Sequence, residues 1–277
     1  MSPDQYCQEK AAQSGSSFYY SFLFLPPEKR RAITALYAFC REVDDVVDEC
    51  SDPQVSRAKL AWWRQEIAGA FAGNPQHPVT RALAPAVQRF NLPPEPFQEI
   101  MDGMEMDLTQ DRYPDFNSLA LYCHRVAGVV GQLSAEIFGY QDHATQKYAH
   151  ELGLAFQLTN IVRDVGEDAR RGRIYLPLDE MAKFGVAPAD VIQGRESEGF
   201  RGLIASQIGR ARAHYEQALA LLPSQDRPSQ RPGLVMAAIY RTLLDEIERD
   251  GCRVLNQRVA LTPIRKLWIA WKTWVKG

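Results

Sequence analysis

The chain has 277 residues, of which 45% are hydrophobic and 24% are charged, and its net charge is −2. This composition is typical of a globular protein with a substantial core, and a net charge so close to zero gives no reason to expect a nucleic-acid partner. Its five cysteines are scattered without a CxxC pair. This pattern argues against a disulfide framework or a zinc site and favours reduced thiols in the cytoplasm.

The sequence shows no recognisable targeting signal. The first residues lack the basic and apolar regions of a signal peptide. No apolar run reaches the roughly 18 residues of a membrane-spanning helix. We therefore expect a cytoplasmic protein, with peripheral contact to the inner face of the membrane as a further expectation developed below.

Helical periodicity dominates the chain. Pro27 and Glu28 suit the first turn of a helix that runs through residue 48. Breaks rich in proline, glycine or polar residues follow, and apolar residues between them recur at spacings of three and four, as at Leu60, Trp63 and Ile67. The breaks lie at residues 51–53, 73–75, 92–94, 113–114 and 141–142.

The C-terminal third continues the helical pattern. Residues 223–232 are rich in proline and serine and are predicted to form a short linker. A helix is predicted from about residue 234 to residue 254, and convincing period-two strands are absent from the sequence. The sequence thus predicts one all-α domain over residues 1–277.

Two acidic clusters are the most informative motifs. Residues 44–48 read DDVVD, with Arg41 three positions upstream, and residues 160–168 read NIVRDVGED, with arginines just beyond. Because residues four apart share a helix face, Asp44 and Asp48 form one stripe. The second stripe consists of Asn160, Asp164 and Asp168, with Gln157 beside it.

The two stripes predict a magnesium site on facing helices. A solvated acidic face is the usual explanation of one such pattern, but apolar runs at residues 36–40 and 152–156 precede the two clusters. Acidic groups in buried helices are costly unless they are paired or bind metal. Mg²⁺ prefers a few carboxylates together with substrate phosphates, so the neighbouring arginines favour a phosphorylated ligand.

Aromatic and small residues suggest what lies next to the predicted magnesium site. Tyr122 and Tyr240 lie in segments rich in small residues, including Gly128 and Gly131. Small residues permit either close helix packing or an elongated apolar ligand, and the sequence alone leaves both alternatives open.

These motifs resemble the squalene/phytoene synthase family over nearly the whole chain. The most specific block is residues 152–168, LGLAFQLTNIVRDVGED, closed by the Arg-x-Tyr-x-Pro motif of residues 173–177. Residues 17–26, 37–48 and 122–131 carry further matches. Family members often have a phosphate-binding serine or histidine before the Ser-Phe pair, where this chain has residues 14–17, SGSS.

The resemblance implies a class I isoprenoid synthase bundle whose helices surround a central cavity that binds two prenyl diphosphates. It implies Mg²⁺ bound by Asp44, Asp48, Asn160, Asp164 and Asp168. It also implies catalytic roles for Tyr122, Arg163 and Tyr240, in neutralising the leaving diphosphate and shielding an allylic cation. The implied substrate-binding residues are Ser17, Phe18, Phe22, Tyr37, Arg41, Gln157, Arg171, Arg173 and Arg258.

Within the family, residues 15–20 and 170–177 most resemble bacterial presqualene diphosphate synthase of hopanoid pathways. Such an enzyme condenses two farnesyl diphosphates, releases diphosphate and needs no NADPH. Phytoene or dehydrosqualene synthase is the alternative, and a full squalene synthase would also need NADPH. A class I terpene cyclase and a non-catalytic helical scaffold are the alternatives from other classes. Downstream enzymes of the pathway are expected partners.

The C-terminal segment predicts an amphipathic helix. Between residues 264 and 276, apolar residues that include three tryptophans recur at spacings of three and four, with lysines and arginine between them. Such a helix is typical of the membrane interface. The alternative is a terminal helix that packs its tryptophan face on the bundle.

Overall fold

The structure, a computed structural model, describes residues 1–13, 18–50 and 52–276. The helices before the centre of the chain are α1 (Pro3–Gln13), α2 (Phe18–Phe22), α3 (Pro27–Asp48), α4 (Pro53–Phe71), α5 (Pro78–Arg89), α6 (Glu95–Met106) and α7 (Phe116–Cys123). A π-helix, η1 (His124–Gly128), connects α7 directly to α8 (Val129–Phe138). The remaining elements are α9 (Ala144–Arg170), α10 (Leu178–Lys183), α11 (Pro188–Ile192), α12 (Glu198–Leu221), the 3₁₀ helix η2 (Ser224–Asp226), α13 (Arg231–Arg249) and α14 (Pro263–Lys276).

The all-α prediction is confirmed. Within the described ranges there is no strand, only an isolated bridge between Arg112 and Ile174. Also within these ranges, no helix combines the length and the apolar character that crossing a bilayer requires.

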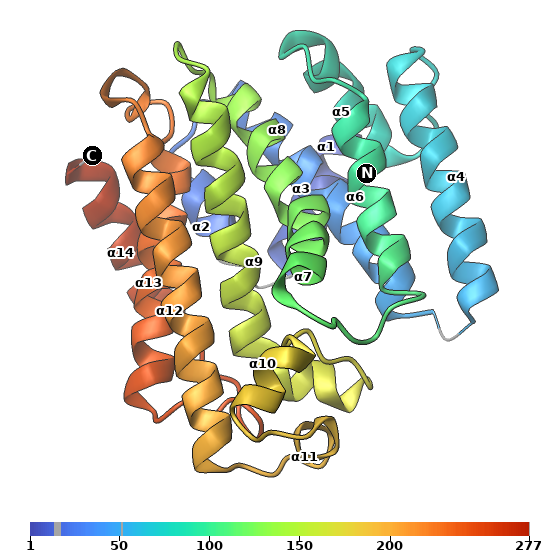
Figure 1. The fold of residues 1–277 in the computed structure, drawn as a ribbon. Coiled ribbons are helices and arrows are strands. Elements are labelled where there is room, and N and C mark those ends of the chain that lie inside the picture. Colours follow the sequence, from blue (N-terminus) through green and yellow to red (C-terminus); the bar gives the residue numbers. More distant parts are fainter. Residues whose placement is uncertain (14–17, 51, 277) are drawn as a thin grey trace.

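Helix α9 runs through the middle of the molecule (Figure 1). It packs against α12 on one side and against α8 and η1 on another, while α13 packs against α14. A helix surrounded by others must be apolar on most of its sides, and α9 buries residues from Thr145 to Ala169 around its circumference. One apolar core lies around α9, α12 and α13, and a second lies around α3, α5 and α6.

Helix α3 shows how the sequence positions the first acidic cluster. Pro27 stands in the first turn, where its missing N–H is not needed. Leu36, Phe39 and Val43 recur at spacings of three and four and are fully buried in the second core. Their burial fixes the rotation of α3 about its own axis. The side that carries Asp44 and Asp48 is therefore turned away from the second core.

Glycines allow α9 to approach the η1–α8 segment closely. A Cβ added to Gly153 would lie 2.3 Å from the carbonyl oxygen of Ala127, and one added to Gly131 would lie 2.2 Å from that of Ala149. Gly131 also lines the central cavity. Close packing and a cavity therefore coexist here, although the sequence presented them as alternatives.

Two sequence-based predictions need correction near the C-terminus. Residues 223–232 are not a simple linker, because Asp226 is buried and accepts hydrogen bonds from the backbone N–H of Gln141, just before α9, and from Thr145 in the first turn of α9. The helix predicted to reach residue 254 ends at Arg249, since Gly251 and Cys252 both have positive φ angles, which end a right-handed helix.

Candidate active site

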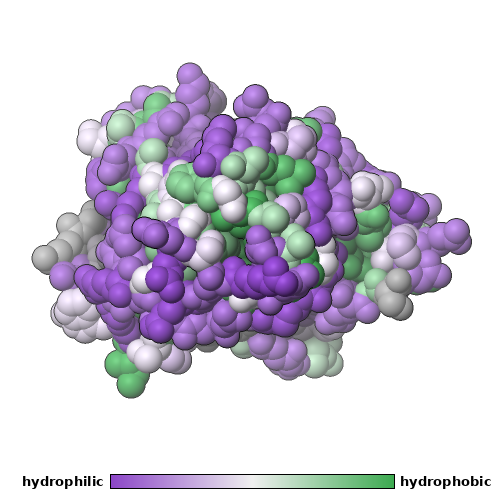
Figure 2. Space-filling model, turned by 60° about the horizontal axis from the view of Figure 1, so that its bottom comes forward, coloured by the Kyte–Doolittle hydropathy of each residue, from purple (hydrophilic) through white to green (hydrophobic). Residues whose placement is uncertain are grey.

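A cavity of about 620 Å³ lies between α2, α3, α8, α9 and α13. One end is polar and carries both acidic clusters, and the other is lined by apolar side chains such as Leu36, Phe138 and Ile239. Figure 2 turns the lower end of the molecule forward and shows hydrophobic residues in the middle of that face, bordered by hydrophilic ones. The volume suits an organic ligand of substantial size.

The first polar wall comes from α3. Asp44 and Asp48 line the cavity, and Arg41 Nη1 donates to Asp44 Oδ2 at 2.6 Å. Asp45 belongs to the same motif but does not line the cavity, because its carboxylate pairs with Lys10 of α1 at 2.8 Å and with the other nitrogen of Arg41. The motif therefore offers the cavity two carboxylates.

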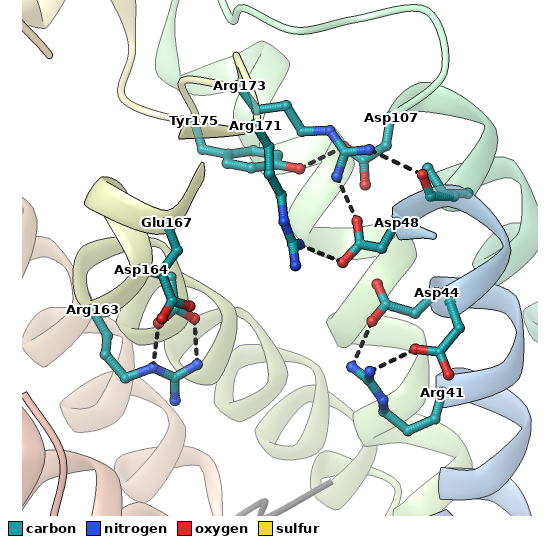
Figure 3. A network of polar contacts seen from close by, with 12 residues as sticks. Arg41, Asp44, Asp48, Asp107, Arg163, Asp164, Glu167, Arg171, Arg173 and Tyr175 are labelled. Atoms are coloured by element: carbon teal, nitrogen blue, oxygen red, sulfur yellow. Dashed lines mark hydrogen bonds and ion pairs between the residues drawn. The ribbon is translucent and has the colours of Figure 1, made fainter. Parts of the chain in front are cut away.

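The second polar wall comes from α9, on the opposite side (Figure 3). Asp164 accepts hydrogen bonds from the neighbouring Arg163 and, at 2.9 Å, from Arg258 Nε. Burial raises the pKa of Asp164, but the guanidiniums of Arg163 and Arg258 outweigh it, and the net shift is downward. Asp164 is therefore a carboxylate at neutral pH.

Arg258 reaches α9 because Gly166 has no side chain. The N–H of Gly166 donates to the carbonyl of Val254 at 3.2 Å. A Cβ on Gly166 would lie 2.1 Å from the carbonyl oxygen of Leu255. This close approach holds the segment after α13 against α9 and brings Arg258 beside Asp164.

Two arginines from the turn after α9 cross to the first wall. Arg171 Nη1 donates to Asp48 Oδ2 at 2.6 Å, and Arg173 Nη1 donates to Asp48 Oδ1 at 2.7 Å. Figure 3 shows both side chains reaching across toward α3. The two acidic clusters and their arginines thus surround one space, as the helical stripes predicted.

The donor chemistry of this space fits Mg²⁺ ions that are completed by a diphosphate. The side-chain oxygen of Asn160 is buried and has no hydrogen-bond partner among the described residues. Burial, followed by repulsion from Asp48, raises the pKa of Asp44 to about 7 against the opposing effect of Arg41. Burial and repulsion from Asp164 raise the pKa of Asp168 to about 8. A cation beside these oxygen atoms would relieve each of these costs.

The carboxylates do not form a compact cage. In the described part of the chain, no three acidic, histidine or cysteine side chains converge on one point as a metal site. The magnesium ligands named from the sequence therefore stay a prediction.

Aromatic rings cover the middle of the cavity. Phe18 lies 5.4 Å from Tyr37 and 6.3 Å from Phe156, measured between ring centroids. Phe156 in turn lies 5.2 Å from Tyr240, which is buried. The rings lie between the polar end and the apolar end of the cavity.

The sequence reasoning missed Asp107, which follows α6. Tyr122 donates to one oxygen of Asp107 at 2.9 Å, and Tyr175 donates to the other at 2.7 Å. Burial raises the pKa of Asp107 to about 6, while the hydroxyl of Tyr175 and the charge of Arg173 lower it. Asp107 and Asp111 are four positions apart in residues 107–111, DLTQD, the spacing that marks the two acidic clusters, so this spacing was a signal that could have identified it.

Lys266 was also missed as a cavity residue. As one of the basic residues of the predicted interfacial helix it was expected at the surface, but it lines the cavity. Burial and the nearby charges of Arg163 and Arg258 lower the pKa of Lys266. The three cations together make the α9 side of the cavity suitable for a diphosphate.

Nearly all predicted site residues line this one cavity. Ser17 lies outside the described residues. The predicted residues that line the cavity are Phe18, Phe22, Tyr37, Arg41, Asp44, Asp48, Tyr122, Gln157, Asn160, Arg163, Asp164, Asp168, Arg171, Arg173, Tyr240 and Arg258.

Comparisons with known proteins agree with this geometry. Phytoene synthase of Arthrospira platensis is 39% identical over 274 residues, covering 94% of this chain and 89% of that protein. The chloroplastic phytoene synthase of Narcissus pseudonarcissus is 38% identical over 267 residues, covering 94% of this chain and 63% of that protein. The chain thus spans less than two thirds of the length of that plant relative.

Solved structures show the same fold. A dehydrosqualene synthase superposes with a TM-score of 0.87 at 28% identity, covering 99% of this chain and 96% of that one. Squalene synthase HpnC from Alicyclobacillus acidocaldarius superposes with a TM-score of 0.80 at 30% identity, covering 90% and 94%. The family model described as squalene/phytoene synthase matches residues 11–265. The chain therefore belongs to the squalene/phytoene synthase family.

Proposed function

We propose that this chain catalyses the head-to-head condensation of two prenyl diphosphates with release of diphosphate. The observation that carries the proposal is the division of the cavity, which joins two walls of carboxylates and arginines to a long apolar interior. A diphosphate matches the polar end, and a prenyl chain matches the apolar end. The acids and arginines at the polar end are those that family membership leads one to expect in the roles of metal and diphosphate binding.

The first step would be loss of diphosphate from one substrate. Asp44, Asp48, Asn160, Asp164 and Asp168 would hold Mg²⁺. When bound, Mg²⁺ supplies Lewis-acid stabilisation of charge on the leaving group. Arg163, Arg258 and Lys266 would pair with phosphate oxygens on the α9 side, and Arg171 and Arg173 on the α3 side.

The aromatic surface would protect the allylic cation that ionisation leaves. Phe18, Phe156 and Tyr240 present ring faces and edges that exclude water and attract positive charge. The double bond of the second substrate would then attack the cation, and loss of a proton would close a cyclopropane ring.

The released diphosphate is the best-supported acceptor of that proton. Burial and the charge of Asp107 raise the pKa of Tyr122 well above its ordinary value, and its hydroxyl donates to Asp107. A phenol in this environment keeps its proton at neutral pH, so it is a poor general base. Tyr122 would instead orient Asp107 and the adjacent wall.

Among the possible substrates, the twenty-carbon substrate of a phytoene synthase now has better support than farnesyl diphosphate. The sequence motifs favoured presqualene diphosphate synthase, but relatives named phytoene synthase are 36–39% identical to this chain. The carotenoid alternative is therefore the better supported one. NADPH is not expected for it, because phytoene formation involves no net reduction.

A fifteen-carbon substrate remains the second candidate because of the solved structures. A dehydrosqualene synthase and squalene synthase HpnC superpose over most of their lengths. Such an enzyme would stop at presqualene diphosphate or continue to a thirty-carbon hydrocarbon.

Mass analysis of products tests both candidates. The purified protein is incubated with Mg²⁺ and either farnesyl or geranylgeranyl diphosphate, each with and without NADPH. A forty-carbon product from geranylgeranyl diphosphate alone supports phytoene synthesis, and thirty-carbon presqualene diphosphate supports the second candidate. Monomeric cyclic terpenes, or no turnover of either substrate, would refute head-to-head condensation.

A further inference from the structure

Helix α14 carries an unusual concentration of exposed apolar side chains. Five of the twelve large hydrophobic side chains that are exposed among the described residues belong to this helix of 14 residues. Their spacing of three, four and seven places them on one side of the helix. They are Ile264, Leu267, Trp268, Trp271 and Val275.

The bundle covers the opposite side of α14. Ile269 and Ala270 are buried, and α14 packs against α13 and α2. Trp268 and Trp271 are 55% and 57% exposed, so the alternative in which the tryptophan face packs on the bundle is wrong for these two residues. Figure 1 places α14 at the edge of the molecule, with no helix beyond it.

The surroundings of this face combine apolar and basic groups. Phe24 is exposed and contacts Trp274 with tilted rings, 5.2 Å between centroids, which widens the apolar area toward α2. Lys272 lies along one border with its Nζ 4.7 Å from the centroid of Trp268. Arg265 lies on the same border and also pairs with Glu246 at 2.7 Å.

We infer that this face of α14 binds a lipid bilayer that contains anionic lipids, with the helix lying in the plane of the interface. Tryptophan prefers the boundary between headgroups and acyl chains, and lysine and arginine beside it complement anionic headgroups. The face consists of one side of α14, about 21 Å long, with Phe24 beside it. A stable protein interface usually needs a broader patch with contributions from several elements.

The location of this face next to the cavity also favours a bilayer as its binding partner. The segment from Arg258 to Leu261 that leads into α14 lines the cavity, as does Lys266 on the inner side of the helix. The same short stretch of chain therefore contacts the cavity on one side and would contact lipid on the other. A long apolar molecule leaving the cavity would have a short path to the acyl chains.

Flotation with vesicles tests the inference without any use of catalytic activity. The full chain is mixed with vesicles of phosphatidylcholine containing 30 mol% phosphatidylglycerol, or of phosphatidylcholine alone, an experimental composition chosen to separate the apolar from the electrostatic contribution. We expect binding to both, tighter on the anionic vesicles. The double variant Trp268→Ser/Trp271→Ser should lose about tenfold or more of its partition coefficient. Lys272→Gln should reduce only the preference for anionic vesicles.

A matched control distinguishes binding through this face from nonspecific binding of exposed tryptophans to vesicles. Trp62 on α4 is 44% exposed, and Trp62→Ser removes an equally large ring far along the chain. It should leave vesicle binding unchanged, and circular dichroism should show that all variants fold.

Two results would overturn the inference. One is equal flotation of the wild type and the double variant. The other is absence of vesicle binding together with a dimer that the double variant converts to a monomer, which would assign the face to a second copy of the chain.

Discussion

Arg173 donates to Asp48 at 2.7 Å, although 125 positions separate the two residues along the chain. Arg171 takes the other carboxylate oxygen at 2.6 Å. The turn after α9 is thus tied to the C-terminal end of α3. This tie places two guanidiniums where a diphosphate bound between the acidic walls would meet them.

The first prediction contrasts two aspartates of the same motif. Asp48→Asn removes a proposed magnesium ligand and should lower kcat by about 100-fold or more, because metal stabilisation of the leaving group is weakened. Asp45→Asn should lower kcat far less, since Asp45 points toward Lys10 and does not line the cavity. Steady-state kinetics with circular dichroism checks both. Equal losses in two folded variants would contradict the assignment.

The second prediction concerns the pKa of Asp107. Burial raises this pKa to about 6, and the hydrogen bond from Tyr175 opposes the rise. Tyr175→Phe should therefore raise the pKa further, so that Asp107 becomes protonated at a higher pH. The acidic limb of the kcat/KM profile should move to higher pH if the carboxylate form of Asp107 supports activity.

Tyr113→Phe is the control for this experiment. The ring of Tyr113 stacks on Tyr175 at 5.7 Å, but its buried hydroxyl has no partner among the described residues. Loss of that hydroxyl should leave the acidic limb in place. Identical shifts in both variants would show that the hydrogen bond from Tyr175 to Asp107 does not control the profile.

The third prediction tests whether Gly166 positions Arg258. Gly166→Ala would place a Cβ 2.1 Å from the carbonyl oxygen of Leu255, so the segment must move away from α9. We expect a loss of about 1–3 kcal/mol in the free energy of unfolding and a lower kcat/KM. Gly209→Ala in α12 meets nothing within 4 Å and should stabilise the protein by about 0.5–1 kcal/mol. Urea unfolding and kinetics measure both, and full activity in a folded Gly166→Ala variant would refute the positioning role.

The fourth prediction concerns stability and pH at Asp226. Burial raises the pKa of this carboxylate, but hydrogen bonds from Thr145 and from the backbone N–H groups of Gln141 and Asp142 lower it by more. A pKa depressed in the folded state stabilises the protein above the unfolded value of about 3.9, and this stability is lost as pH falls through the folded value.

Asp226→Asn should therefore cost about 2 kcal/mol at pH 7, because an amide cannot accept all three hydrogen bonds. The difference between variant and wild type should shrink below about pH 4. Urea titrations at pH 7 and pH 3.5 measure it. Asp111→Asn changes an exposed aspartate and should alter stability by less than about 0.5 kcal/mol. A difference that grows on acidification would contradict the sign of the shift.

The sequence by itself determined the helices and the two acidic stripes. Apolar spacing predicts α3 and α9, Pro27 marks the start of α3, and a period of 3.6 residues places Asp44 with Asp48 and Asn160 with Asp164. These relations are local, so they do not depend on how the helices pack. The linker at residues 223–232 and the end of α13 were mispredicted because buried hydrogen bonds and positive φ angles there depend on tertiary contacts.

Only the tertiary structure decided which charges meet. Asp45 pairs with Lys10 instead of lining the cavity. Arg258 and Lys266 line the cavity although they lie about 100 positions after the acidic cluster of α9 in the sequence. Asp107 meets Tyr122 and Tyr175 because α6, α7 and the turn after α9 converge there. Such meetings depend on close approaches like that of Gly166 to Leu255, and no helical period encodes them.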